Sequence, residues 1–209
     1  VQTCALPILL RQLNYYQIPS FLIGVVVVPV EILTSEQKSK YGKFTERPTS
    51  EQLAKYFWFD DQDRMIIFKL RSDYNCLGFA IQLGTVRFLG VFLSNPLDVP
   101  PNVCAYIAQQ LGLNSNSLSN YCVARTIHSH AQEIRRIYRY HDFNEQPYHW
   151  RLIRWLYTRA WLTAERPSIL FDLATARCVG KKILLPGVTI MARFIDRKST
   201  RLNSSHRLY

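Results

Sequence analysis

The sequence DYNCLGFAIQLGTVRFLG, from Asp73 to Gly90, is apolar on nearly every face of a 3.6-residue repeat. A helix that is apolar on all sides is usually buried in the middle of a helical domain. Gly78 and Gly84 each disfavour a helix by about 1 kcal/mol relative to Ala, but small residues let neighbouring helices approach closely. Asp73 is the expected N-cap, since its carboxylate can accept from free N–H groups at a helix start. We therefore predict a central helix from Asp73 to about Leu93 that forms core and has no catalytic role.

Helix start signals recur on both sides of this segment, whereas strand signals are scarce. Thr34 and Thr49 each begin a Thr-x-x-Gln spacing, in which the two side chains satisfy backbone N–H groups reciprocally. Asp60, Asp61 and Asp63 suit the positive end of a helix dipole, so we interpret them as a helix entry rather than as a metal or catalytic site. Further helices are predicted at about residues 102–111, 126–141, 145–163 and 168–179.

The predicted fold class is all-α, with the helices arranged as a multi-helix bundle. Pro96, Pro100 and Pro101 make the best internal boundary, so the chain is divided into helical subdomains at residues 28–95 and 96–195. The turn at Gly112 separates two short helices, which fits a helix-turn-helix-like second half. Many helical hairpins share that pattern, so a plain bundle is the alternative.

Both ends of the chain resemble sequencing artefacts rather than domain sequence. Residues 196–206 resemble the translation of a common short-read sequencing adapter, and residues 1–8 resemble the same adapter read from its reverse complement. We therefore expect residues 1–27 to be adapter and upstream read-through and residues 196–209 to be adapter. A membrane segment or signal peptide is the alternative for residues 18–30, but this run is shorter than the roughly 20 residues that span a bilayer, and no cleavage site follows it.

Positive charge is concentrated in the second half of the chain. The whole sequence carries 26 basic and 15 acidic residues, a net charge of +11. From Val28 to Ala124 basic and acidic residues balance at nine each, whereas the segment from Arg125 to Ile195 carries twelve basic and five acidic residues. Such an excess is expected of a surface that meets a polyanion, and a solvated helical surface is the alternative.

The densest basic cluster lies in the helix predicted from Thr126 to His141. Arg135, Arg136 and Arg139 lie beside or opposite the apolar stripe of that helix. Arginines on one helix can bind phosphates with two hydrogen bonds or contact guanine edges. The alternative is three solvated arginines near a helix C-terminus, where cations are favoured in any case.

Five further basic residues complete the predicted DNA-binding set. Arg125 opens the basic half, Arg151 and Arg154 are expected to face outward from the helix at 145–163, and Lys181 and Lys182 follow a helix end. The last four of these side chains are expected to contact the DNA backbone. The inner face of the helix at 145–163 is predicted to consist of Trp150, Ile153, Leu156, Tyr157, Ala160 and Trp161.

No catalytic or metal-binding pattern is recognisable in the sequence. The cysteines are far apart in apolar helical segments, so we interpret them as small buried hydrophobic residues. His128, His130, His141 and His149 match no metal-ligand spacing and are interpreted as surface or helix-end groups. There is no phosphate-binding glycine loop, no nucleophile elbow and no carboxylate trio for two metals. We therefore predict no enzyme activity, no metal and no cofactor for this chain by itself.

Three segments together resemble the N-terminal region of Tn-three-family transposases, the replicative class II enzymes. The most specific is Asp-x-Asn-x-Leu-Gly-Phe-Ala-x-Gln-Leu from Asp73, followed by Arg-Phe-x-Gly from Arg87. Residues 29–44 resemble the start of that family, and residues 183–189 resemble the end of its first domain. The resemblance spans roughly Val28 to Ile195.

The resemblance implies an N-terminal transposase fragment that binds double-stranded DNA at terminal inverted repeats, in the bacterial cytoplasm and nucleoid, without a membrane. In that family the Asp-Asp-Glu catalytic domain lies far toward the C-terminus, outside this chain. The basic residues proposed for DNA contact are inferred from charge, not from the family. The alternative is a helical module for protein–protein interaction or self-association, with Tyr140, Phe143, Tyr148 and Trp150 as the exposed contact.

Overall fold

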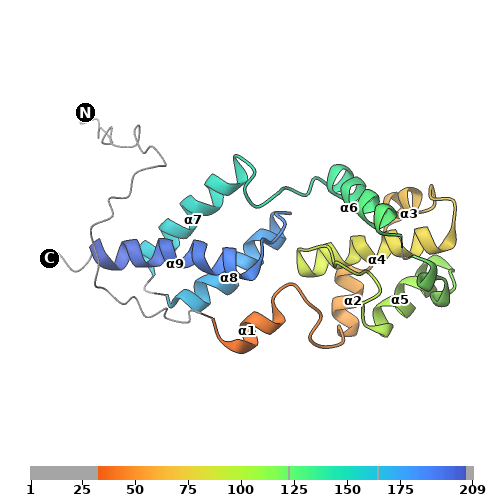
Figure 1. The fold of residues 1–209 in the computed structure, drawn as a ribbon, viewed down its shortest axis with the longest axis horizontal. Coiled ribbons are helices and arrows are strands. Elements are labelled where there is room, and N and C mark those ends of the chain that lie inside the picture. Colours follow the sequence, from red (N-terminus) through yellow and green to blue (C-terminus); the bar gives the residue numbers. More distant parts are fainter. Residues whose placement is uncertain (1–32, 122, 164, 206–209) are drawn as a thin grey trace. The chain divides into compact units, whose positions relative to one another are not determined.

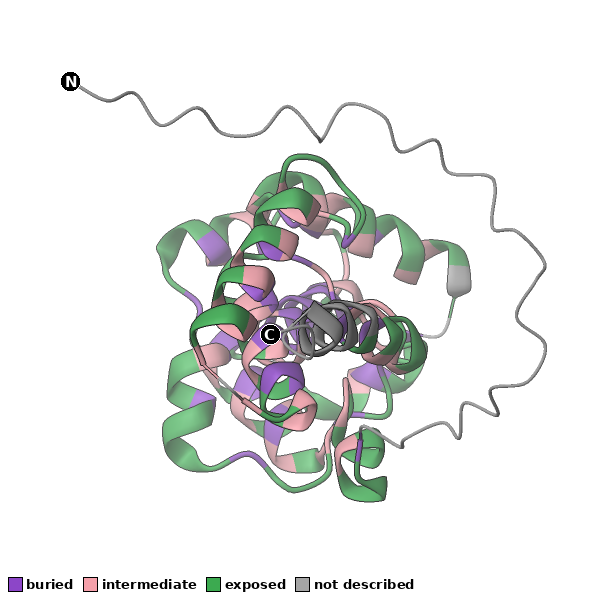
Figure 2. Cartoon of the chain, turned by 90° about the vertical axis from the view of Figure 1, so that its left-hand side faces the viewer, coloured by how far each residue is buried: buried purple, intermediate pink, exposed green. Residues whose placement is uncertain are grey.

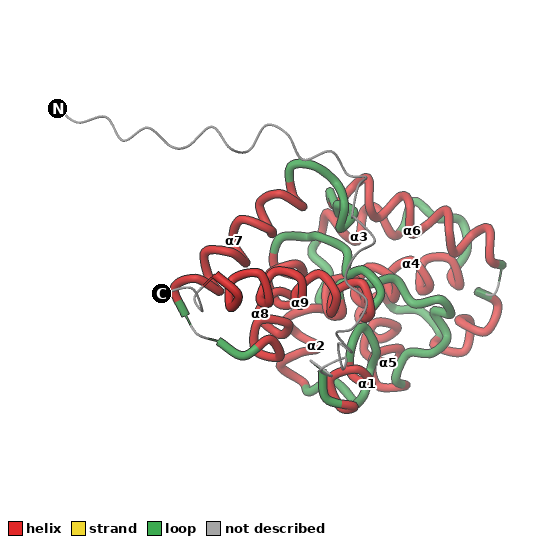
Figure 3. Tube along the Cα trace, turned by 60° about the vertical axis from the view of Figure 1, so that its left-hand side comes forward, coloured by secondary structure: helices red, strands yellow, loops and turns green. Residues whose placement is uncertain are grey.

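The computed structural model describes residues 33–121, 123–163 and 165–205, and helices make up most of this part of the chain (Figure 1). The only extended pairing within these ranges is an isolated bridge between His141 and Ile183, and Figure 3 shows helices joined by loops. The predicted all-α class is confirmed. The predicted read-through at residues 1–27 lies outside the described residues.

In chain order the helices are α1 (Ser35–Lys40), α2 (Ser50–Tyr56), α3 (Asp61–Ile67), α4 (Asp73–Leu89), α5 (Pro101–Leu111), the 3-10 helix η1 (Ser115–Asn120), α6 (Ala124–Tyr138), α7 (Tyr148–Leu162), α8 (Pro167–Gly180) and α9 (Val188–Ser205).

Helices α1, α2 and α3 each begin at a capping box. Thr34, Thr49 and Asp60 accept a hydrogen bond from the backbone N–H three residues on, and the side chain at that position accepts from the N–H of the cap. Each box satisfies two backbone donors that have no partner within the helix. The two Thr-x-x-Gln predictions and the helix entry at Asp60 are confirmed.

Helix α4 is the centre of the first hydrophobic core. Every residue over Cys76–Val86 is buried, and α4 contacts α2, α3, α5, η1 and α6. Figures 1 and 3 both show α6 lying along α4. Two boundaries differ from the prediction, because Ser72 occupies the N-cap without a side-chain hydrogen bond and Asp73 is the first helical residue. The helix ends at Leu89, where Gly90 adopts the left-handed conformation with φ 74°.

Two glycines permit the close packing around α4. A Cβ atom added at Gly78 would lie less than 3.0 Å from the ring of Tyr121, and one added at Gly84 would lie less than 3.0 Å from the ring of Phe57. Both rings are almost completely buried. These glycines therefore leave room for large side chains from neighbouring segments, as the sequence indicated.

Buried side chains form two hydrophobic cores. The first contains residues from α2 to Tyr140, and the second is built from α7, α8 and α9 together with Leu33 and Phe143. Figure 2 shows the buried residues on the inner sides of the helices and exposed residues on the outer sides. The Pro96–Pro101 segment does not separate the cores, because the first core takes residues from both sides of it. The subdomain boundary at residues 95 and 96 stays a prediction, and Tyr140 is the last buried residue that the first core contains.

The segment expected to resemble a helix-turn-helix departs from that motif. Gly112 does close the turn after α5, with φ 67°. The next element, η1, is a six-residue 3-10 helix that packs on α4 and buries Leu118. The side chain of Asn114 accepts from the N–H of Asn116, and such local hydrogen bonds compete with an α-helix. This pair of helices therefore presents no exposed second α-helix.

Three polar side chains form a chain of hydrogen bonds inside the first core. Gln82 Nε2 donates to the Tyr121 hydroxyl at 2.6 Å and to the Ile127 carbonyl at 3.1 Å, and the same hydroxyl lies 2.8 Å from His130 Nδ1. The Tyr121 oxygen accepts from Gln82, and its own proton can be donated to Nδ1 when that nitrogen is unprotonated. Burial lowers the pKa of His130, and Glu133 partly opposes this effect. The prediction of a surface or helix-end group is wrong for His130, because this residue lies on the α6 face that packs into the core.

Replacing His130 with Asn is expected to make stability less sensitive to acid. In the wild type, the unfolded chain takes up a proton at this histidine as the pH falls below its ordinary pKa of 6.5, whereas the folded protein resists protonation. The free energy of unfolding should therefore fall as the pH falls from about 7.5 to about 5.5. Asn keeps an acceptor near the position of Nδ1 but does not titrate, so its variant should lose part of that slope.

Urea unfolding at the two pH values measures this effect, and His128→Asn is the matched control. His128 lies on the same helix but is exposed, so its replacement should leave the pH dependence close to that of the wild type. Equal slopes in the wild type and in both variants would contradict the assignment of a neutral buried His130.

Candidate nucleic-acid interface

The predicted arginine cluster lies at the C-terminal end of α6 and is divided by its contacts. Arg135 donates to the Asp142 carboxylate in an ion pair. Arg136 is exposed, and the described residues provide it with no ion pair. Arg139 is also exposed and caps α6 in the left-handed conformation, with φ 56°, so the helix ends at Tyr138 rather than at the predicted His141. Two of the three arginines are therefore open to solvent, and the third is held by a neighbouring carboxylate.

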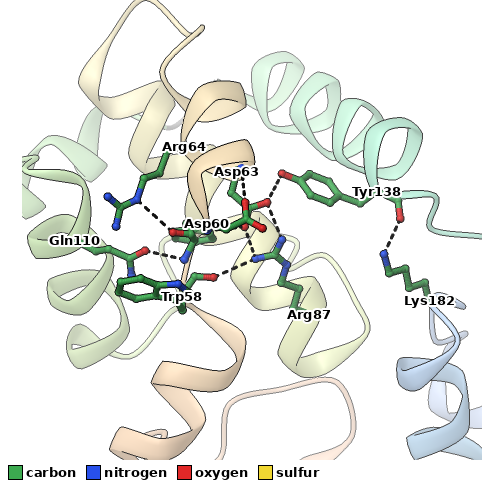
Figure 4. Close-up of polar contacts among 9 residues, drawn as sticks. Trp58, Asp60, Asp63, Arg64, Arg87, Gln110, Tyr138 and Lys182 are labelled. Carbon is green, nitrogen blue, oxygen red and sulfur yellow. Dashed lines mark hydrogen bonds and ion pairs between the residues drawn. The ribbon is translucent and has the colours of Figure 1, made fainter.

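A buried ionic cluster fastens this end of α6 to α3 and α4 (Figure 4). Arg87 donates two hydrogen bonds to the Asp63 carboxylate, at 2.8 and 2.9 Å, and the Tyr138 hydroxyl donates to the same carboxylate at 2.7 Å. The Asp63 side chain is only 5% exposed and that of Arg87 is 25% exposed. Burial and the hydrogen bond to Asp63 raise the pKa of Tyr138. The cluster therefore fixes α6 relative to the buried α4, and it gives Asp63 a role beyond the helix entry predicted for it.

The segment after α6 also pairs with the segment after α8. The His141 N–H donates to the Lys182 carbonyl at 2.9 Å, and the Leu184 N–H donates to the His141 carbonyl at 2.8 Å. The Lys182 ammonium group donates to the Tyr138 carbonyl at 3.3 Å, a contact also drawn in Figure 4. Lys182 is exposed, but its carbonyl and its ammonium group both form hydrogen bonds that join the end of α6 to the segment after α8.

A basic groove of about 490 Å³ lies between α7 and α8. Arg151 and Arg154 come from α7, Arg177 from α8, and Lys181 follows α8 directly. None of the described residues that line it is acidic. We call this feature the basic groove; its remaining lining residues are Tyr148, Leu152, Trp155, Thr158 and Ile183.

Aromatic rings support the cations of the basic groove. The guanidinium carbon of Arg177 lies 4.7 Å from the ring centroid of Trp155, and that of Arg151 lies 5.8 Å from the centroid of Tyr148. The other partner of Tyr148 is the imidazole ring of His141, stacked at 3.7 Å between centroids. Cation–π contacts of this kind hold a guanidinium in place while leaving its N–H groups available to an anion.

A larger hollow of about 870 Å³ lies between α1, α2, α4 and α8 but carries charges of both signs. Lys40 is paired there with Glu36, and Gln37 donates to the Asp172 carboxylate. A polyanion would meet carboxylates as well as cations at this place, so it is a poorer candidate than the basic groove.

Comparison with known proteins identifies the family of this chain. A family model described as a domain of unknown function (DUF4158) matches residues 32–197. The chain belongs to the DUF4158 family. The transposase for transposon gamma-delta of Escherichia coli (strain K12) is 42% identical over 178 residues, which are 84% of this chain and 18% of that protein.

Two further relatives are also transposases. The transposase for transposon Tn1546 of Enterococcus faecium is 30% identical over 79% of this chain and 16% of its own length, and that for transposon Tn501 of Pseudomonas aeruginosa is 28% identical over 74% and 16%. The resemblance to Tn-three-family transposases is confirmed. The chain spans less than a fifth of the length of these relatives.

In the DUF4158 domain, six of the eight predicted basic residues fall into two groups, and Arg135 and Lys182 belong to neither. Arg151, Arg154 and Lys181 come together at the basic groove. Arg125, Arg136 and Arg139 are exposed on or next to α6. Arg135 is paired with Asp142, and Lys182 contacts the Tyr138 carbonyl. Arg177 belongs to the groove but was not among the predicted residues, although its place late in the helix beside Lys181 could have indicated it.

Two of the four aromatic residues predicted to form a protein contact on the DUF4158 domain are buried, and Tyr148 is half-buried. Tyr140 and Phe143 are 9% and 6% exposed, because they pack into the first and second cores. Trp150 is exposed, at 63%, which corrects its predicted place on the inner face of α7. Trp161 is also exposed, at 60%, whereas Leu152 and Leu156 are the buried residues of this helix.

Two further observations concern the described part of the DUF4158 domain. No group of three or more His, Cys, Asp or Glu side chains lies close enough together there to hold a metal ion. None of the helices described is both long and apolar enough to cross a membrane.

Proposed function

We propose that this DUF4158 domain binds the terminal inverted-repeat DNA of a transposon as the N-terminal part of a transposase. The observation that carries the proposal is the basic groove, where four cations meet without a carboxylate among the lining residues. Such an arrangement favours phosphate groups, since Arg and Lys donors both position and neutralise a nucleic-acid backbone. Catalysis of strand transfer belongs, in this proposal, to the remainder of the transposase, which acts on DNA in the bacterial cytoplasm and nucleoid.

Removing three cations from the basic groove is expected to weaken DNA binding and its dependence on salt. The variant Arg151→Ala/Arg154→Ala/Lys181→Ala changes only exposed side chains. Each lost phosphate contact should reduce the slope of log K against log salt by about 0.9, so three contacts should reduce it by about 2.7. Fluorescence anisotropy with a labelled duplex carrying one end of transposon gamma-delta, between about 50 and about 200 mM salt, measures the slope.

The matched control is Arg47→Ala/Lys69→Ala/Arg71→Ala, which removes the same charges from exposed positions outside the basic half. Its salt slope should stay close to that of the wild type. If both triple variants kept the wild-type slope, the basic groove would not be the DNA contact. If the wild type bound no duplex at all, the proposed function itself would be wrong.

Self-association of the transposase through α7 is a second candidate function. The observation that favours it is the exposure of Trp150 and Leu162, at 63% and 75%, on this helix. Sedimentation velocity of the same preparation distinguishes the two functions, since a monomer that binds transposon-end DNA does not need this surface for binding.

A further inference from the structure

Helix α6 presents a continuous polar stripe on the side opposite its apolar face. Ile127, His130, Ile134 and Tyr138 pack into or against the first core. At 3.6 residues per turn, one set of positions falls on the opposite side of the helix, and all of its members are exposed. We call this set the α6 polar stripe; it consists of Arg125, His128, Ser129, Gln132 and Arg136, and the exposed Arg139 follows at the C-cap of the helix.

The α6 polar stripe combines hydrogen-bonding groups with positive charge. It contains arginine, amide, imidazole and hydroxyl groups but no carboxylate and no large apolar side chain. Glu133 follows Gln132 in the sequence but is half-buried, and its charge raises the pKa of His130, opposing the effect of burial. Arg135 borders the stripe but is paired with Asp142. The acids of this region are therefore placed beside the stripe rather than on it.

Gln132 has hydrogen-bonding capacity left over for a ligand. Its Nε2 lies 2.9 Å from His128 Nε2, and because an amide nitrogen can only donate, the imidazole nitrogen must accept. This bond uses one of the two amide hydrogens and holds the side chain in place. The second hydrogen and the Oε1 atom remain as an adjacent donor and acceptor, which is the pair that matches N7 and the N6 amino group of adenine in the major groove.

We propose that the α6 polar stripe lies in the major groove of the bound duplex and reads base edges, with Gln132 facing an adenine and Arg136 facing a guanine. This assignment rests on the proposed DNA-binding function and gives the two basic surfaces of the domain different roles in it. The α6 polar stripe supplies sequence readout, whereas the basic groove supplies phosphate contacts that are the same for every sequence.

The dimensions of α6 suit this role. Its 15 residues extend over about 22 Å, and an α-helix with its side chains fits the major groove of B-DNA, which is about 12 Å wide. The helix is also rigidly mounted, since its apolar face packs on α4 and its C-terminal end is fixed by the Asp63–Arg87–Tyr138 cluster. Base readout depends on such fixed placement of a few side chains.

Selection from a pool of duplexes with about 20 randomised base pairs tests the assignment with the full chain. The wild type should enrich a motif that contains adenine and guanine positions. Gln132→Ala should bind the selected duplex roughly tenfold or more weakly, because one bidentate base contact is lost, and should change binding to an unrelated duplex by less than about twofold, because no charge is removed. Gln62→Ala, an exposed amide on α3, is the matched control and should change neither.

The outcomes separate this inference from the function on which it rests. If the wild type bound duplexes with a steep salt dependence but enriched no motif, the readout by α6 would be wrong while the DNA-binding function stood. If a motif were enriched and both Gln132→Ala and Arg136→Ala enriched it unchanged, readout would have to come from another element. Absence of any duplex binding by the wild type would overturn both.

Discussion

Replacing Asp63 with Asn should lower the free energy of unfolding by about 3–5 kcal/mol, the range observed when one partner of a buried ion pair is removed. The carboxylate is 5% exposed, accepts two hydrogen bonds from Arg87, and accepts a third from Tyr138. An amide at this position has no charge and directs two hydrogens at groups that are themselves donors. The guanidinium of Arg87 would be left largely buried without its counter-charge.

Urea unfolding followed by circular dichroism measures the loss, with Asp61→Asn as the control. Asp61 lies in the first turn of the same helix but is exposed, so its replacement should change stability by no more than about 0.5 kcal/mol. The variant Arg87→Met removes the other partner. The double variant should lose less than the sum of the two single losses, by about 0.5–3 kcal/mol. Equal stability of Asp63→Asn and Asp61→Asn would show that the Asp63–Arg87–Tyr138 cluster does not fasten α6 to α3 and α4.

Replacing Gly78 with Ala should also destabilise the protein, although Ala is the better helix former. Ala gains about 1 kcal/mol over Gly in a helix interior. At this position, however, the added methyl group would lie less than 3.0 Å from the ring of Tyr121, which is 1% exposed and bonded to Gln82. Overpacking of a core costs about 1–3 kcal/mol and sometimes more, so we expect a net loss of that order.

Gly180→Ala is the control for this substitution. Gly180 ends α8, and a Cβ atom added there would meet nothing within 4 Å. Ala at this position should therefore be neutral or stabilising by up to about 1 kcal/mol. The melting temperatures of the two variants should move in opposite directions or, at least, differ clearly. A Gly78→Ala protein as stable as the control would mean that Tyr121 does not pack against α4 as described.

The parts of the fold that could be predicted from sequence are those governed by local rules. The capping boxes at Thr34 and Thr49 depend on residues three positions apart, and the burial of α4 follows from an apolar surface on all faces. The ends of α6 could not be predicted in the same way. Arg139 terminates that helix in a left-handed conformation that sequence rules reserve for Gly or Asn.

The candidate site was predicted in its residue types but not in its grouping. Charge counting found Arg151, Arg154 and Lys181, which α7 and α8 bring to one groove. It could not find that Asp142 engages Arg135, because that ion pair depends on the turn after α6. His130 was assigned to the surface because an imidazole carries no pattern that distinguishes a buried hydrogen-bonded ring from an exposed one.

The pairing of His141 with Lys182 and Leu184 uses peptide groups rather than side chains. Substitutions other than proline in either segment therefore leave both hydrogen-bonding partners in place, provided that neither segment changes length. The pairing joins the segment after α6 to the segment after α8, which carries Lys181 of the basic groove. If α6 and the basic groove both contact DNA, this backbone pairing fixes the distance between the two contacts. Among related transposases, the spacing between the two parts of the binding site should then diverge more slowly than the bases within each part.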